Sequence, residues 1–583
     1  MFRRAVVALT LAVGPSAHAE SIDATLARIP RDAIAVVAVP SLKAASDDLQ
    51  LALDRMGRAE AALGGRPIDL LKAQARIGPG FDDRGALASW VLPRGDSVAH
   101  VAAIPVTDAD AFVAGTFSPI PGRDDGAMQW PVGDLTVWVR KTPSYVVVSD
   151  RADALGTNEG DAAQGIGPVL AERLGARGGE LMRMADLVAW ASAPALRRQA
   201  AERRAPAEMA AIESRIAELL GQVDDALLTV DFDALAIGVR AMARFAPETE
   251  VARAIPSGVP AADARGLLAR LPAAPFYGAL GVDLEAMGGA SRVRQFLATI
   301  PGSERVTLPA WIDAVQDKVK QVQVAAFPSK LAILSGGILN DASFVVVTDD
   351  PVAVKAALRA WVESQAGEAA GVRREPTWED ARTLKDGSTV TAFAVKETVT
   401  GPGGDPLERV FRQLVVSSRG LHGFAREVPG ALVVTYSQRT DVLGRATAAA
   451  SRADGTKVLG DHAVVRAMQP WLVPQPDLVL FVGVGELLAA ARQAAESVPG
   501  MDPALVPVAG AGIEPLAAAF RSRDRMWEGA LVVPSGILGI GFDAARARVM
   551  QPDANVPAPA GAPAPAPVPA PVPTPAPTAP STP

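Results

Sequence analysis

The chain has no cysteine, and this absence excludes disulfide bonds, thiolate metal sites, a catalytic thiol and a lipid on an N-terminal cysteine. Histidine is scarce as well, because the 583 residues include only His18, His100, His422 and His462. No HExxH or HxH spacing joins these histidines, so nothing in the sequence supports a zinc-hydrolase site. We interpret the histidines as structural.

Other catalytic signatures are missing too. The sequence has no GxSxG elbow, no SxxK motif of the penicillin-binding type and no GxxxxGK[ST] phosphate loop. The Ser-Gly turns at Leu334–Gly337 and Val533–Gly536 are weak nucleophile signals, and "GVGELL" (Gly483–Leu488) indicates close packing more than a dinucleotide site. A serine, a histidine and an acid from distant segments could still meet in the fold. From the sequence we assign no catalytic, cofactor-binding or metal-binding residue.

The N-terminus has the three parts of an export signal. Arg3 and Arg4 precede the apolar "AVVALTLAV" (Ala5–Val13), and "AHA" (Ala17–Ala19) predicts cleavage after this triplet. Cleavage removes two arginines and no acid, so the net charge moves from −7 to −9. An acidic exported protein is a poor candidate for nucleic-acid binding. No later stretch predicts a transmembrane helix, so we expect export to the periplasm or cell envelope of a Gram-negative bacterium.

The C-terminus is low in complexity. "VPAPAGAPAPAPVPAPVPTPAPTAPSTP" (Val556–Pro583) is rich in proline, which removes backbone donors and fixes φ, so it predicts an extended polyproline-like tail. The tail is either disordered without a specific partner or a spacer in the envelope.

Internal repetition is the strongest positive signal. Four segments begin beside a turn signal, continue as an apolar run and end in a small or polar pair before Leu, which predicts a buried strand followed by a helix start. They are Asp32–Leu42, Asp186–Leu196, Ala274–Leu284 and Asp477–Leu487. Ser41, Asp283 and Gly485 stand at N-cap positions within them.

Two further units recur. One predicts strand, turn and helix, with Thr107-Asp108 and Thr348-Asp349 as helix caps rather than metal ligands. The other predicts two strands joined by a turn. The paired segments are Ser97–Phe117 with Ala342–Val362, and Ala226–Val239 with Ala530–Phe542.

Asp231 and Asp233 are spaced like paired catalytic carboxylates in "DDALLTVDFDALAIGVRA" (Asp224–Ala241). The related Ala530–Phe542 has "PSG" in place of "DFDA", and these residue types share a preference for turns. We therefore predict the tip of a hairpin and not an active site. The acidic clusters Phe81–Gly85 and Gly122–Gly126 lack the ligand spacing of an EF-hand and are likewise predicted to be surface turns.

The units occur twice in the same order. This order predicts an α+β fold of two tandem, diverged copies, each a mixed or largely antiparallel sheet with helices packed on one face, plus a disordered C-terminal tail. The predicted boundaries are a signal peptide at 1–19, a first copy at 20–250, a second copy with insertions at 251–550, and the tail at 551–583. The amphipathic stretch Pro206–Gln222 predicts a helix that packs on its own domain, with membrane-surface docking as the alternative.

Four segments bear a resemblance to other chains. They are "IPRDAIAVVAVPSL", "HVAAIPVTDADAFVAG", "YVVVSDRADAL" (Tyr145–Leu155) and "GLLARLPAAPFYGALGVDL" (Gly266–Leu284). In these the chain resembles a loose group of uncharacterised secreted proteins of Gram-negative bacteria, of the myxobacterial and planctomycete type. The resemblance covers most of 29–545 and implies no catalytic residues.

We expect a non-enzymatic exported envelope protein with a binding or scaffold role, no cofactor, and an envelope protein, lipid or polymer as its partner. One alternative is a hydrolase whose site is assembled from distant residues. Another is a periplasmic carrier or chaperone that uses a groove between the two copies.

Overall fold

The structure is a computed structural model, and it describes residues 21–55, 66–130, 135–155, 165–202, 218–255, 262–289, 291–292, 310–329, 337–369, 371–384, 387–400, 420–497, 502–508 and 513–540. Contacts group residues 1–540 into one compact unit and 541–583 into another, and all described residues lie in the first. The predicted signal peptide, the predicted tail and most of the amphipathic stretch Pro206–Gln222 lie outside the described residues.

Twenty-one strands of the described chain hydrogen-bond into one sheet, and every pairing among them is antiparallel. The first half of the sheet runs, from its outer edge, through β4 (Ser118–Pro119), β5 (Ala127–Trp130), β6 (Leu135–Lys141), β7 (Tyr145–Ser149), β3 (Ser97–Pro105), β2 (Leu87–Arg94), β1 (Ala35–Val39), β8 (Leu187–Ser192), β9 (Val223–Phe232) and β10 (Ala236–Phe245).

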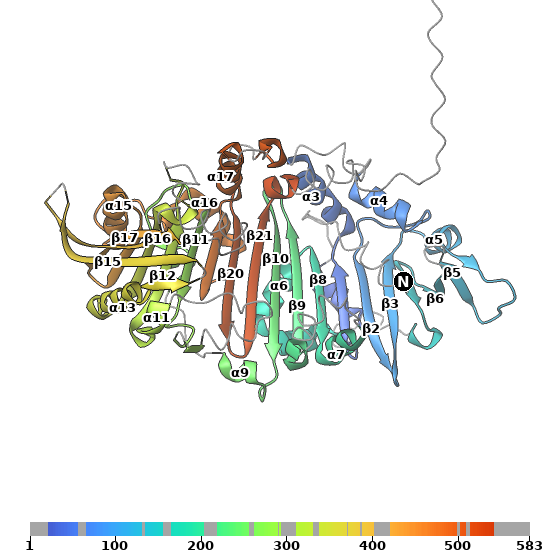
Figure 1. Cartoon of the computed structure of the whole chain (residues 1–583). Coiled ribbons are helices and arrows are strands. Elements are labelled where there is room, and N and C mark those ends of the chain that lie inside the picture. Colours follow the sequence, from blue (N-terminus) through green and yellow to red (C-terminus); the bar gives the residue numbers. More distant parts are fainter. Residues whose placement is uncertain are drawn as a thin grey trace, which may run out of the picture. The chain divides into compact units, whose positions relative to one another are not determined.

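The second half continues from β10 with the same kind of strand order. It runs through β21 (Met526–Pro534), β20 (Leu516–Arg523), β19 (Leu478–Val482), β11 (Gly278–Asp283), β12 (Val319–Ala326), β13 (Ala342–Thr348), β18 (Ala431–Tyr436), β17 (Leu421–Val428), β16 (Thr389–Val399), β15 (Val372–Thr383) and β14 (Gly367–Ala369). Thus β1 lies between β2 and β8, and β11 lies between β12 and β19 (Figure 1).

The hairpins β9–β10 and β20–β21 have the same register. Phe232 lies opposite Ile237 in the first hairpin, and Ser522 lies opposite Trp527 in the same way in the second. Strands β10 and β21 then pair with each other, and Arg240 lies opposite Ala530 at the middle of their ladder. The predicted boundary at residue 250 stays a prediction, and the segments on its two sides share one continuous sheet.

One predicted hairpin is wrong. Ala530 lies inside β21, which ends at Pro534, and residues 535–540 are helical. The turn is earlier in the chain, at Asp524 and Arg525, whose φ angles are 50° and 62°. The prediction was based on the similar sequences of Ala226–Val239 and Ala530–Phe542. A short apolar run does not show whether a strand continues into a hairpin or into a helix.

The predicted strands were confirmed, but the predicted helix caps were confirmed only in part. Gly485 is not a cap, because the helix there begins at Val484. All four recurring segments form strands, namely β1, β8, β11 and β19. Ser41 accepts a hydrogen bond from the Ala44 N–H (3.3 Å) before α3, and Asp108 caps α5. In the second unit the cap is Asp350 and not Asp349, because Pro351 opens the helix and the residue before it is the one in the N-cap position. After β11, residues 284–289 form turns instead of a helix.

Helices pack on both faces of the sheet, which corrects the prediction of one covered face. In the first half, α3 (Leu42–Arg55), α4 (Pro67–Gln74) and α5 (Ala109–Thr116) cover one face, termed the α3 face, and α2 (Ile22–Ala27) and α6 (Gly167–Met184) cover the other, termed the α6 face. In the second half, α11 (Ala310–Asp313) and α13 (Pro351–Ser364) lie on the α3 face, and α15 (Thr440–Ala450) and α16 (Ala463–Met468) on the α6 face. The strands are apolar on both sides, so each side needs cover.

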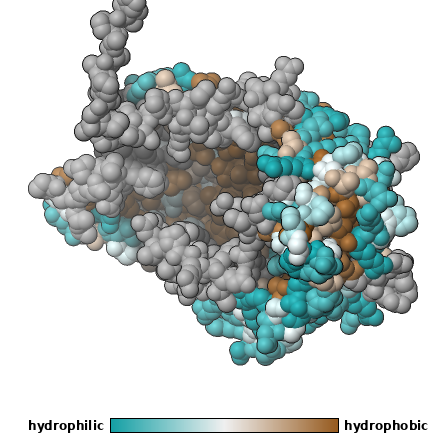
Figure 2. Space-filling view, turned by 90° about the vertical axis from the view of Figure 1, so that its right-hand side faces the viewer, coloured by the Kyte–Doolittle hydropathy of each residue, from teal (hydrophilic) through white to brown (hydrophobic). Residues whose placement is uncertain are grey.

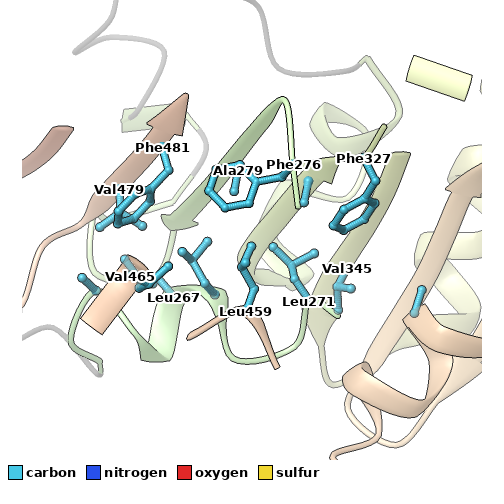
Figure 3. Packing of buried hydrophobic residues seen from close by; sticks show 14 of the residues in the cluster. Leu267, Leu271, Phe276, Ala279, Phe327, Val345, Leu459, Val465, Val479 and Phe481 are labelled. Atoms are coloured by element: carbon cyan, nitrogen blue, oxygen red, sulfur yellow. The ribbon is translucent and has the colours of Figure 1, made fainter. Parts of the chain in front are cut away.

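Three further helices follow strands, and they are α7 (Ala193–Glu202), α9 (Glu250–Ala254) and α17 (Val484–Ser497). The core of the second half on the α6 face is drawn in Figure 3. Ala279 from β11 and Phe481 from β19 face Leu267 and Leu271 of the preceding segment, and Val465 of α16 closes the cluster. This packing fixes β11 and β19 at the middle of the sheet.

Candidate functional site: an open apolar sheet face

The central strands present an apolar surface on the α3 face. One row across the sheet consists of Ala189, Leu228, Ala241, Gly529, Phe520 and Leu478. The next row consists of Val230, Val239, Leu531, Ala518, Leu480 and Leu280. Neither row contains a polar side chain, and none of these residues is fully buried.

The exposure of this surface follows the pleat of the strands. Leu228 and Leu531 are each 40% exposed, whereas their neighbours on the α6 face, such as Leu227 and Val532, are buried. In Figure 1 the described helix α6 lies behind the central strands, and on the opposite side α3 packs against one end of β9. Figure 2 shows a hollow with a hydrophobic floor. We term this surface, defined by the two rows, the open apolar face.

The open apolar face is large for an exposed apolar surface. Each row crosses six strands, which at about 4.8 Å between strands corresponds to roughly 24 Å. An antiparallel sheet with a solvated face ordinarily places polar residues there, and contiguous exposed apolar surface marks an interaction site in a soluble protein. The arrangement can therefore bind an apolar ligand.

The α6 face of the same strands holds buried charges instead. Glu528 of β21 accepts from the Arg177 guanidinium of α6 at 2.9 and 2.6 Å, and it also pairs with Arg521. Asp225 of β9 accepts from Arg173, also on α6, at 3.2 Å. Because α6 belongs to the first half of the sheet and β21 to the second, the Arg177–Glu528 pair ties the two halves together.

Asp231 lies on the buried α6 face of β9. The prediction that it is a turn residue is therefore wrong. It lies in β9 opposite Gly238 and forms an ion pair with Arg240. A side chain at Gly238 would meet the Trp471 ring at 2.7 Å, so the ring packs against this glycine. Burial raises the pKa of Asp231 to about 6, although the Arg240 guanidinium opposes the rise. Both side chains of the pair are buried.

Asp233 is a turn residue, as predicted. Its carboxylate accepts from the Leu235 N–H at 2.9 Å, and its own N–H donates to the Ala236 carbonyl. Nearby, Asp186 stands directly before β8 and accepts from the Phe232 N–H at 2.9 Å. Burial raises the pKa of Asp186 to about 7, and the carboxylates of Asp231, Asp48 and Asp233 add to the rise.

The corresponding acid of the second half has a different partner. Asp477 stands directly before β19 and accepts from the Ser522 N–H at 2.7 Å, which is the same contact at the corresponding place on the second hairpin. Unlike Asp186, it also accepts from the Arg523 guanidinium at 2.6 Å. Arg523 occupies the hairpin position that corresponds to Asp233. The two halves therefore place opposite charges around one backbone arrangement.

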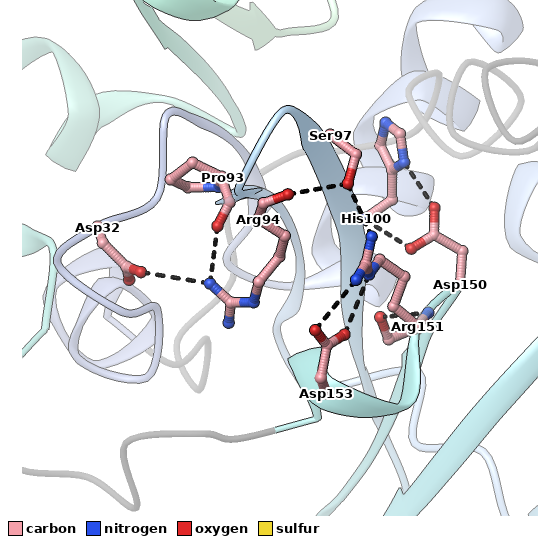
Figure 4. A network of polar contacts seen from close by, with 9 residues as sticks. Asp32, Pro93, Arg94, Ser97, His100, Asp150, Arg151 and Asp153 are labelled. Atoms are coloured by element: carbon pink, nitrogen blue, oxygen red, sulfur yellow. Dashed lines mark hydrogen bonds and ion pairs between the residues drawn. The ribbon is translucent and has the colours of Figure 1, made fainter.

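The histidines have local partners. His100 Nδ1 lies 2.8 Å from the Asp150 carboxylate, which the sequence did not indicate because the two are 50 residues apart (Figure 4). The nearby Ser97 hydroxyl donates to the Arg94 carbonyl (2.9 Å) and accepts from Arg151 (2.7 Å), so its proton points away from the imidazole.

The two remaining described histidines contact backbone. His462 Nδ1 accepts from the Val464 N–H at 3.4 Å at the start of α16, and His422 Nδ1 lies 3.1 Å from the Gly420 carbonyl. His18 lies outside the described residues. Within the described ranges, no group of three or more histidines or acids could hold a metal ion.

The other segments that the sequence analysis considered also have structural roles. In Phe81–Gly85, Asp82 accepts from the Arg84 N–H (3.0 Å), and in Gly122–Gly126, Asp125 accepts from the Ala127 N–H (3.2 Å). A side chain at Gly483 would meet the Phe276 carbonyl oxygen at 2.1 Å, so this glycine is required by close packing. Most of Leu334–Gly337 lies outside the described residues, and Val533–Gly536 joins β21 to a helix.

Sequence reasoning missed the open apolar face. In β9 the row residues alternate with Asp225, Thr229 and Asp231, and such a pattern predicts that the polar side of the strand faces solvent, whereas these polar residues are buried on the α6 face. Only the neighbouring elements show which side of the strand is left uncovered.

Comparison with known proteins yields little. No family model matches the chain, and no curated protein matches it. One solved structure, described as crystal form III of TP0453, is similar over 48% of this chain and 97% of that chain, with 9% identity and a TM-score of 0.22. At that score the likeness carries no argument about fold or function. In the part of the chain that the structure describes, every helix is too short or too polar to cross a membrane.

Proposed function

We propose that this protein is a non-enzymatic envelope protein that binds the acyl chains of a lipid on the open apolar face. The observation that carries the proposal is the pair of apolar rows that cross six central strands without a polar side chain while remaining partly exposed. Contact with water does not explain such a surface, because exposed leucine and valine side chains on a sheet lower the solubility of a protein.

An acyl chain fits the chemistry of this face better than a glycan polymer does. It needs no hydrogen-bond partner, whereas a glycan polymer needs several convergent polar groups, and the rows have none. The hydrocarbon of one bilayer leaflet is about 15 Å thick, half of a core of about 30 Å, and each row extends roughly 24 Å. Each methylene buried on the face contributes about 0.8 kcal/mol.

We also propose that the face arose by duplication with divergence. The same strand order in both halves, the matching register of the two hairpins and the symmetric pairing around Arg240 and Ala530 support this. Strands β8, β9 and β10 then come from one copy, and β21, β20 and β19 from the other. The groove expected between two copies corresponds to this face. Export through residues 1–19 and a spacer role for 551–583 complete the proposal.

The test is binding of a fluorescent long-chain fatty acid to the mature chain, measured by titration at pH 6. Leu228→Asp and Leu531→Asp each place a charge in one row, and we expect either to weaken binding by tenfold or more, which corresponds to about 1.4 kcal/mol. Val352→Asp is the matched control, because Val352 is 59% exposed on α13 and lies outside both rows. Its affinity should equal that of the unmodified protein.

Three outcomes would count against the proposal. One is absence of probe binding by a folded protein, and another is equal weakening by all three substitutions. The third is concentration-dependent dimerisation that Leu228→Asp abolishes, since the face would then be covered by a second copy. Circular dichroism of each variant ensures that any loss is not caused by unfolding.

A further inference from the structure

The open apolar face has an aromatic end. Trp527 lies on the same side of β21 as Gly529 and Leu531, because every second residue of a strand faces the same way. The centroid of the Trp527 ring is 6.0 Å from that of Phe520 and 4.5 Å from that of Phe245, and both pairs are T-shaped. Phe520 belongs to one of the two rows, so the aromatic cluster of Phe245, Phe520 and Trp527 is continuous with the face.

The aromatic cluster lies beside α9 and the turn between β20 and β21. Val251 and Ala252 of α9 share a buried cluster with Phe245, and Trp527 packs against it. In Figure 1, α9 and the β20–β21 turn lie at the lower end of the central strands, and α3 lies at their upper end. The two ends of the open apolar face therefore differ in their surroundings.

The distance between the two ends suits an acyl chain. Trp527, Gly529, Leu531 and Val533 follow one another on the same side of β21, and none of them is fully buried. Six residue steps in a strand span roughly 20 Å at about 3.4 Å per residue. The hydrocarbon of one bilayer leaflet is about 15 Å thick, so an extended acyl chain can lie along this strand.

A cation stands beside the aromatic cluster. Arg525 lies in the β20–β21 turn, and its guanidinium donates to the Phe245 carbonyl at 3.4 Å. The Arg525 carbonyl in turn accepts from the Phe245 N–H at 2.9 Å. No acid pairs with Arg525 in the part of the chain that the structure describes, whereas Arg523 pairs with Asp477. A guanidinium has five N–H donors, so Arg525 retains donors for a carboxylate.

The opposite end of β10 carries an acid. Asp233 lies in the β9–β10 turn, and its carboxylate accepts from the Leu235 N–H at 2.9 Å. A negatively charged ligand group is repelled by Asp233 and attracted by Arg525. The charges at the two ends therefore favour one direction of an anionic lipid on the face.

We propose that the ligand of the open apolar face is a long-chain fatty acid, whose carboxylate pairs with Arg525 and whose chain runs from the aromatic cluster along β21 toward the α3 end. Phe245, Phe520 and Trp527 then contact the methylenes nearest the carboxylate. This inference rests on the proposed function, because it assigns the head group and the direction of the lipid bound there.

The head group is tested with a fluorescent long-chain fatty acid and its methyl ester, each titrated with the mature protein at pH 8, where the free acid is ionised. The two probes share one chain and differ in charge. We expect Arg525→Gln to weaken binding of the acid by about fivefold or more, because the ion pair is lost. Binding of the ester should change by less than about twofold.

Arg253→Gln is the matched control for the loss of one positive charge. Arg253 is exposed on the neighbouring α9, and its guanidinium likewise donates to a backbone carbonyl, that of Thr249, at 3.3 Å. We expect Arg253→Gln to bind the acid and the ester as the original protein does.

The direction of the chain is tested by quenching of Trp527 fluorescence. Fatty acids with bromine near the carboxyl group or near the chain end are bound to the original protein and to Trp527→Phe, and the difference between the two proteins isolates Trp527. We expect bromine near the carboxyl group to quench Trp527 more strongly than bromine near the chain end. This measurement does not require Arg525→Gln to fold.

The outcomes separate this inference from the proposed function. If neither probe binds to the folded protein, both are contradicted. If both probes bind and Arg525→Gln leaves the acid unaffected, or weakens acid and ester equally, the assignment of Arg525 is overturned and acyl binding stands. Equal weakening of acid binding by Arg253→Gln also overturns that assignment. Stronger quenching of Trp527 from the chain end overturns the direction.

Discussion

The hairpins β9–β10 and β20–β21 have one register and opposite charges. Asp231 and Asp233 in the first correspond, by their place in that register, to Arg521 and Arg523 in the second. In both, the acid before the neighbouring strand accepts a backbone N–H of the hairpin. The backbone hydrogen bonds therefore hold the same arrangement in both halves. The charges of the side chains around it differ from one half to the other.

The largest expected effect is the loss of Asp477. Asp477→Ala leaves the Arg523 guanidinium, which is largely buried, without its anion, and leaves the Ser522 N–H without an acceptor. We expect a loss of about 3–5 kcal/mol in the free energy of unfolding. Asp186→Ala leaves no cation unpaired and should cost less than about 2 kcal/mol at pH 7.5. Urea denaturation of both variants measures the two values, and equal losses would refute the contrast.

A second difference concerns the ends of β8 and β19. Ser192 in β8 corresponds in position to Gly483 after β19. The Ser192 hydroxyl donates to the Ile34 carbonyl at 3.0 Å. Gly483→Ala places a methyl group against the Phe276 carbonyl oxygen and should cost about 1–3 kcal/mol. Ser192→Ala removes one neutral hydrogen bond and should cost about 1 kcal/mol. If thermal denaturation shows that Gly483→Ala is as stable as the original protein, the backbone around residue 483 moves to make room for the methyl group.

The third prediction uses the pH dependence of stability. The pKa of Asp186 is about 7 in the folded protein and about 3.9 when unfolded, so the folded state binds more protons between these values. Its contribution to stability is therefore fully present below about pH 4 and is lost as the pH rises through 7.

Asp186→Asn should remove this loss. At pH 8 we expect the variant to be more stable than the original by about 1–2 kcal/mol, a value reduced for partial solvent screening. Melting temperatures between pH 5 and 8.5 provide the measurement. Asp477→Asn serves as the control and should be destabilised at every pH, since its carboxylate is paired with Arg523. If the melting temperatures of Asp186→Asn and of the original protein change with pH in parallel, Asp186 is not the source of the pH dependence.

The smallest effect is expected from making the first hairpin resemble the second. Asp233→Arg supplies the cation that Arg523 provides in the other half, although it loses the acceptor for the Leu235 N–H. The net gain at pH 8 should be about 1 kcal/mol or less, together with a flatter pH profile. If the profile keeps its slope while the variant remains folded, the electrostatic correspondence between the hairpins does not hold.

Much of the local structure was predictable from the sequence. The apolar runs at Asp32–Leu42 and Asp477–Leu487 predicted strands that the structure contains, and Ser41 and Asp108 were correctly placed as caps. The hairpin at Ala530–Phe542 and the single helical face were wrong. Both errors came from apolar runs, which do not tell on which side, or against which partner, a strand is buried.

The sequence by itself determined the recurring strands and the helix caps Ser41 and Asp108. These depend on residues a few positions apart, through the pleat of a strand and the hydrogen bonds of a helix end. Only the tertiary structure decided that Asp231 pairs with Arg240, that Asp477 has an arginine partner and Asp186 a backbone N–H alone, and that the two apolar rows stay partly exposed. Burial and charge neutralisation depend on neighbours that can be far away in the chain, and folding alone brings them together.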